Sequence, residues 1–148
     1  MTEPPSLLTL NLEGWPVSVN DAYVSFKKKV PGRGVIVMRR LSADAEAYKK
    51  QVQFHIGQQL ALRDPLRRNL PYGLRIELLS PDLLTKGWPA TAKNRYKVID
   101  ASNYIKVLED SLCEVLGLDD SHFFDVRVLK RSAARQMTVV HVLALNQE

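Results

Sequence analysis

The sequence predicts an α+β fold, in which a small mixed β-sheet packs against two main helices within a single domain. A length of 148 residues with 45% apolar residues suits one domain with one buried core. Apolar and polar residues alternate in several stretches, as they do in half-buried strands, and two other stretches have helical character. The expected order is three strands, a helix, a strand, a helix and two strands, which is not the order of a regular parallel βαβ array.

The domain is expected to span residues 1–148, with residues 1–6 as a leader and residues 142–148 as the end most open to fraying. The first strand is "LLTLNLEG". "AYVSFKKK" and "GVIVMRR" form a basic hairpin or flap around "VPGRG". Ser42 is placed to cap a helix over residues 43–62, which has acidic residues in its first turn.

A fourth strand, "GLRIELLS", is expected to point Arg75 and Glu77 outward. The polar stretch over residues 81–99 is expected to be an irregular loop, and loops of this length are uncommon unless they function or are disordered. The last two strands, "HFFDVRVLKR" and "MTVVHVLAL", are expected to pair with each other around "SAARQ".

The second helix is placed by its periodicity at 100° per residue, and Gly117 ends it. Its apolar arc consists of Ile105, Leu108, Leu112, Val115 and Leu116. Its polar arc consists of Asn103, Lys106, Asp110 and Glu114. The single cysteine, Cys113, lies inside this helix and is interpreted as a small buried hydrophobe.

No run of 18 apolar residues occurs, and "MTEPPSLLTL" lacks the charged and apolar regions of a signal peptide. The sequence therefore predicts a cytoplasmic protein with no membrane partner.

Charge is distributed unevenly along a chain whose formal net charge is +5. Six basic residues and no acidic residue occur between Lys27 and Arg40. Between Asp100 and Asp125, in contrast, seven acidic residues accompany Lys106 alone. The basic stretch favours contact with an anionic polymer, and its alternative role is solubility.

The acidic stretch "KVIDASNYIKVLEDSLCEVLGLDD" has two interpretations. Clustered Asp oxygens are hard ligands that suit Mg²⁺ or Mn²⁺ together with phosphate oxygens. Asp100 and the pair Asp119 and Asp120 lie near opposite ends of the helix, so they share one ion only if the following chain folds back along it. The alternative is an ordinary solvated helix face that is followed by an ordinary turn.

Three segments together resemble RusA-type Holliday-junction resolvases over roughly residues 15–130: "DASNYIKVLEDSLCEVLGLDDSHF", "PVSVNDAY" and "SADAEAYKKQV". In this resemblance Asp100 matches the first catalytic Asp, Asn103 and Lys106 match the polar pair that follows, and Asp110 matches a helix Asp. Asp120 matches the second member of the later Asp pair, and Asp119 is its neighbour. Ser102 departs from the pattern, because the family has an Asp there. A Ser hydroxyl can coordinate Mg²⁺ but carries no charge.

The resemblance implies a homodimeric, Mg²⁺-dependent endonuclease that nicks opposed strands of a four-way DNA junction in recombination and repair, with Mn²⁺ as a possible substitute. Asp100 and Asp120, with Asp119 and Ser102, would hold the metal, while Asn103 and Asp110 would support the site. Lys106 would stabilise the attacked phosphate. The residues expected to bind DNA are Lys27, Lys28, Lys29, Arg33, Arg39, Arg40, Lys86, Lys93, Arg95 and Lys97.

Two other functions stay open. A branched-DNA-binding protein that has lost cleavage would explain Ser102, and a nuclease for flaps or other branched substrates would use the same residues. His122 stands where the family usually has Gln, and it either orients a water or is a polar residue at a strand start.

Overall fold

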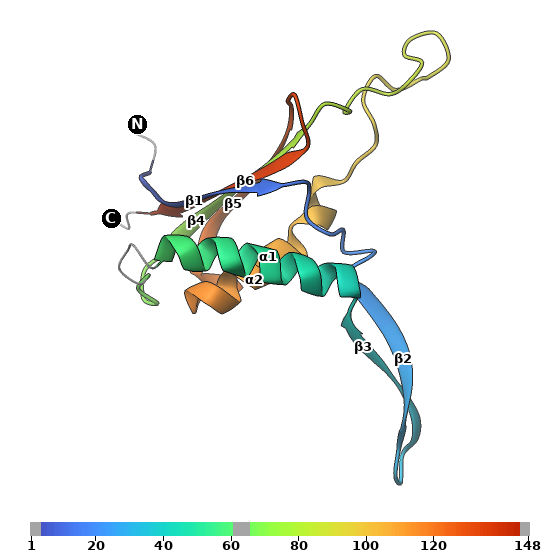
Figure 1. Cartoon of the computed structure of the whole chain (residues 1–148), viewed down its shortest axis with the longest axis vertical. Helices are drawn as coiled ribbons and strands as arrows, with labels where there is room; N and C mark the ends of the chain where they lie inside the picture. Colours follow the sequence, from blue (N-terminus) through green and yellow to red (C-terminus); the bar gives the residue numbers. More distant parts are fainter. Residues whose placement is uncertain (1–3, 61–65, 146–148) are drawn as a thin grey trace.

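The computed structural model describes residues 4–60 and 66–145. A four-stranded sheet in the order β1-β6-β4-β5 carries both helices on one face, and a separate two-stranded hairpin projects from this body (Figure 1). The strands are β1 (Ser6–Glu13), β2 (Tyr23–Val30), β3 (Gly34–Leu41), β4 (Tyr72–Ser80), β5 (Phe123–Ser132) and β6 (Met137–Ala144). The helices are α1 (Ala43–Leu60), α2 (Lys106–Leu116) and the short 3₁₀ helices η1 (Ala101–Tyr104) and η2 (Asp120–His122). The α+β prediction, its mixed sheet and its two main helices are confirmed.

The element bounds differ from the expected ones mainly at the ends. β1 begins inside the expected leader, and β6 includes residues 142–144 of the segment expected to fray. Residues 61 and 62 of the expected first helix lie outside the described residues, as do residues 1–3 and 146–148. No helix in the described part of the chain is both long and apolar enough to cross a membrane.

The core lies between the sheet and the two helices. Leu74, Ile76 and Leu78 of β4 point into it and are almost fully buried, whereas Arg75 and Glu77 point to the opposite face, as predicted. Full burial of each such aliphatic side chain contributes about 1.5–3 kcal/mol. On α2 the predicted residues Leu108, Leu112 and Leu116 are buried, while Ile105 and Val115 are half-buried. Val107 and Ser111 are buried as well, which the predicted arc does not include.

The expected pairing of the last two strands is wrong, because β4 lies between them. β4 pairs with β5 in parallel and with β6 antiparallel. β4 has the most continuously buried pattern of the sheet, and a central position satisfies its backbone groups on both edges. The turn after β5 therefore passes over the end of β4, where the amide of Ala133 donates to the carbonyl of Ser80 at 3.1 Å.

Two projections leave the body at the same end (Figure 1). One is the predicted hairpin of β2 and β3, whose strands pair over their full length. The other is residues 81–97, which we call the arm. The expected irregular loop is held narrow by a bridge between Leu84 and Tyr96, and by amide bonds of 2.8 Å from Thr85 to Arg95 and from Lys97 to Leu83.

Both helices have the predicted end signals. The Ser42 hydroxyl accepts the amide of Ala45 at 3.2 Å, which caps α1. Gly117 ends α2 with φ of 66°, a left-handed conformation that residues with a side chain rarely adopt. This turn directs the chain into Asp119 and Asp120.

We expect Gly117→Ala to lower the free energy of unfolding by about 1 kcal/mol, because a Cβ is strained at positive φ. The thermal midpoint should fall by about 2–4 °C in a scanning calorimeter. Gly57→Ala is the matched control, since Gly57 lies on an exposed position of α1 with open space around an added Cβ. That change should stabilise the protein by about 0.5–1 kcal/mol. A stabilising effect of Gly117→Ala would contradict the left-handed turn.

Candidate functional site

Asp100 stands at the start of η1, directly after the arm. Its Oδ1 accepts two hydrogen bonds from Ser102, one from the amide at 3.1 Å and one from the hydroxyl at 2.7 Å. These bonds lower the pKa of the exposed Asp100 carboxyl, and the positive charge of Lys130 adds to the effect. Within the described residues no protein group engages Oδ2. Asp100 is therefore held as a carboxylate with one oxygen available.

Ser102 supports Asp100 in this geometry, because its hydroxyl donates to the carboxylate. Its expected role as a direct metal ligand stays a prediction. Asn103 is held by its backbone: its carbonyl accepts the amide of Val19 at 2.7 Å, which ties η1 to the segment that leads into the hairpin.

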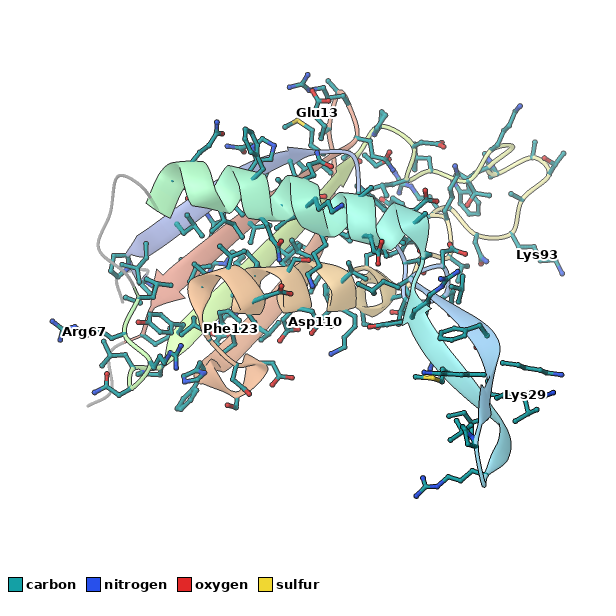
Figure 2. The ribbon with its side chains drawn as sticks, turned by 60° about the horizontal axis from the view of Figure 1, so that its bottom comes forward. Glu13, Lys29, Arg67, Lys93, Asp110 and Phe123 are labelled. Carbon is teal, nitrogen blue, oxygen red and sulfur yellow. The ribbon has the colours of Figure 1, made fainter. Side chains whose placement is uncertain are left out.

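A second group of charges lines the exposed face of α2. Lys106 Nζ lies 3.0 Å from Asp110 Oδ1, and this hydrogen bond raises the pKa of Lys106. Asp120 lies close enough to add to that increase, and it also raises the pKa of the half-buried Glu109, where burial is the larger cause. The turn at Gly117 thus brings Asp120 back along α2 toward Lys106. Figure 2 shows Asp110 on α2 within this region.

Asp119 has a different environment from Asp120. Its Oδ1 accepts the amide of Ser121 at 2.9 Å, while its own amide donates to Nδ1 of His122 at 2.9 Å. The hydrogen bonds of Ser121 lower the pKa of Asp119. Asp119 and His122 therefore cap η2 for each other, and this contact gives His122 a local structural role. Of the two neighbouring acids, Asp120 is the one whose charge raises the pKa of Lys106.

Asp100 and Asp120 do not form part of a preassembled metal cage. Among residues 4–60 and 66–145, no three carboxylate, histidine or cysteine side chains converge on one point. Mg²⁺ does not require such a cage, since it commonly binds one or two carboxylates and takes its other ligands from water and phosphate. Asp100, with its available oxygen, and Asp120 each present the carboxylate chemistry that such a site uses.

Glu109 and Lys130 also lie near the site. Glu109 belongs to the acidic stretch singled out in the sequence, and the charge of Asp120 helps to raise its pKa. Lys130 was not among the candidates from the sequence. Lys130 reaches the site from β5, where its Nζ donates to the carbonyl of Ile99 at 2.7 Å. No local spacing reveals that contact, because 31 residues separate the partners.

The two faces of the hairpin differ in composition. Alternation and cross-strand pairing place Lys27, Lys29 and Arg39 on one face, together with the exposed Val35 and Val37. The other face carries Phe26, Ile36 and Met38, together with Lys28 and Arg40, and Arg40 stacks over Phe26 at 5.5 Å. Arg33 lies in the turn between the strands.

The arm carries the other predicted DNA-binding residues. Lys86, Lys93 and Arg95 are exposed, whereas Lys97 forms an ion pair with Asp82. Figure 2 shows Lys29 on the hairpin and Lys93 on the outer part of the arm, so positive charge extends from the body in two directions. Asp100 follows the arm and is joined to the base of the hairpin through η1.

A cavity of about 770 Å³ lies between the base of the hairpin, the end of β4 and η1. Its lining includes Trp15 and Tyr104, whose rings meet edge to face at 5.3 Å. Asp21, Asp44 and Asp82 make its charged lining mainly acidic. Phosphate is therefore disfavoured inside the cavity and favoured along the basic projections.

A comparison with protein families identifies the family of the chain. The model of the family described as endodeoxyribonuclease RusA matches residues 16–143, a span that includes the hairpin, the arm, both helices and the acidic residues. No curated protein matches the chain. The family match covers most of the sequence, and the chain belongs to the RusA endodeoxyribonuclease family.

Proposed function

We propose that the protein is a Mg²⁺-dependent endonuclease that resolves four-way DNA junctions by paired nicking in recombination and repair. The observation that carries this proposal is the position of Asp100. Its carboxylate, with one oxygen available, lies where two basic projections leave the body of an endodeoxyribonuclease-family chain.

Phosphodiester hydrolysis requires neutralisation of the phosphate charge, an activated water and a basic surface that holds the backbone. Mg²⁺, or Mn²⁺ in its place, supplies charge neutralisation and water activation when bound. Asp100 and Asp120 would hold the ion, with Asp119 beside them. Lys106, oriented by Asp110 at 3.0 Å, would contact the phosphate under attack.

Pairing of two chains follows from the substrate. A four-way junction must be cut in two strands, and two identical sites related by a two-fold axis meet that need with one gene product. We therefore propose a homodimer in which each protomer contributes one site and one pair of basic projections.

A protein that binds branched DNA without cutting it is the second candidate. Ser102 favours it, because a neutral hydroxyl replaces a carboxylate beside Asp100 and leaves less negative charge to attract a divalent cation.

We expect Asp100→Asn and Asp120→Asn each to reduce cleavage of a labelled four-way junction by at least about 100-fold in Mg²⁺, because each removes a charged metal ligand. Junction binding without metal, measured by band shift, should stay close to that of the parent. Asp125→Asn is the matched control, since Asp125 lies on β5 and pairs with Arg127 at 3.0 Å. It should cut normally. If the parent protein binds junctions without cutting them, the second candidate function is supported. If the parent cuts flaps in preference to junctions, flaps are the substrate.

A separate prediction concerns Ser102. Ser102→Ala removes the 2.7 Å bond to Asp100 and should raise the Mg²⁺ concentration for half-maximal cleavage roughly tenfold. Ser102→Asp adds a negative charge next to Asp100 and should lower that concentration. Identical Mg²⁺ titrations for the parent and both variants would place residue 102 outside the site.

The two faces of the hairpin give a further prediction. Replacing Lys27 and Lys29 together by Gln should reduce the slope of log K against log salt by about 1.8, or about 0.9 for each phosphate that a lysine no longer neutralises. The matched control replaces Lys28 and Arg40 by Gln, which removes the same charge from the opposite face. Its slope should change less, because the face of Lys27 and Lys29 also carries Arg39 and has three basic residues against two. Equal changes for both pairs would show that the two faces contact DNA alike.

A further inference from the structure

Lys130 connects the edge of the sheet to the segment that carries Asp100. It lies near the end of β5, level with Leu78 of the central strand, and therefore on the face that the helices cover. From there its Nζ donates to the carbonyl of Ile99 at 2.7 Å. The bonded carbonyl belongs to the residue directly before Asp100.

The segment over residues 98–100 has few other contacts. It follows the last amide bond of the arm, at Lys97, precedes η1 and belongs to no helix or strand. Ile99 is half-buried and lines the cavity. Val98 is 90% exposed, so it contributes little packing. Within η1 the amide of Asn103 donates to the carbonyl of Asp100 at 3.1 Å, and the carbonyl of Asn103 accepts the amide of Val19 at 2.7 Å. Among the described residues, Lys130 is the side chain of the sheet that bonds this segment.

The position of Asp100 depends on the direction of the backbone at residues 99 and 100. Ser102 fixes the carboxylate relative to η1, but those bonds are local and move with the segment. The bond from Lys130 is long-range and relates the segment to the rigid sheet. Loss of an outer partner that orients a metal ligand typically costs about 10–100-fold in metal affinity or activity.

We propose that Lys130 is a positioning residue, which anchors the Ile99 carbonyl to β5 and thereby sets where Asp100 presents its available oxygen. This inference rests on the proposed metal role of Asp100. It deepens that role by joining the site to the edge strand of the sheet.

Lys130 could also act on a bound metal ion through its positive charge alone. The two roles predict opposite changes in metal affinity when Lys130 is removed. Lys130 is positive, so if it acted only through its charge, its removal would favour a nearby cation and tighten metal binding. If it acts by positioning Asp100, its removal weakens metal binding. The direction of the change in Mn²⁺ affinity therefore distinguishes the two roles.

The test compares the parent with Lys130→Met, Lys130→Arg and Arg131→Met. Arginine keeps a charged donor for the Ile99 carbonyl. Arg131→Met removes one charge from the next residue, which points to the opposite face and pairs with Glu77 at 3.1 Å. Two quantities are measured on the full chain without DNA: the ¹⁵N relaxation order parameters of the Ile99–Ser102 amides in metal-free protein, and the Mn²⁺ dissociation constant by calorimetry.

We expect Lys130→Met to lower the order parameters of Ile99–Ser102 from about 0.85 toward about 0.6. We also expect it to weaken Mn²⁺ binding roughly tenfold. Lys130→Arg and Arg131→Met should resemble the parent, and the amide spectra of the core should be unchanged in all variants. Unchanged order parameters in Lys130→Met, or Mn²⁺ binding that is equal or tighter, would overturn the proposal. If the parent binds no Mn²⁺, the proposed metal function fails, and the relaxation data alone then decide whether Lys130 positions the segment.

Discussion

The parallel pairing of β4 with β5 is the constraint on which the other features of the site depend. Two consecutive parallel strands require the chain to return across the sheet between them. Here the arm, η1, α2 and η2 together make that return. Asp100 lies within this return, at the start of η1, and Asp120 lies near its end, so the crossover places both acidic residues.

The turn at Gly117 modifies this arrangement. A helix of 11 residues separates its ends by about 16 Å at 1.5 Å per residue, which is too far for ligands at both ends to share an ion. The left-handed turn directs Asp120 back along the helix, where its charge acts on Lys106 and Glu109. Asp110 of α2 and Asp120 after it thereby act on the same basic side chain, in a protein that is basic as a whole.

Features that depend on neighbouring residues were predictable from the sequence, and those that depend on distant contacts were not. The Ser42 cap, the Gly117 turn and the outward direction of Arg75 and Glu77 follow from local patterns, and the structure has each of them. β4 lies between β5 and β6 because strands distant in the sequence compete to pair with one another. The alternation of apolar and polar residues within one strand does not predict its partner. Lys130 was missed for the same reason, since its partner is distant in sequence. Ser102 was noticed only as a missing charge, because its bond to Asp100 depends on the backbone of η1.

The pairing of β1 with β6 has a consequence for biosynthesis. Leu10 of β1 lies opposite Val140 of β6. Because these strands are near opposite ends of the sequence, β6 is synthesised long after β1. Leu8, Leu10 and Leu12 are almost fully buried in the finished protein, yet they lack this partner strand until nearly all of the described chain has been made. Contacts of such high sequence separation slow folding and lengthen the exposure of apolar surface. The nascent chain therefore exposes these leucines most before β6 emerges, and aggregation is favoured during that interval.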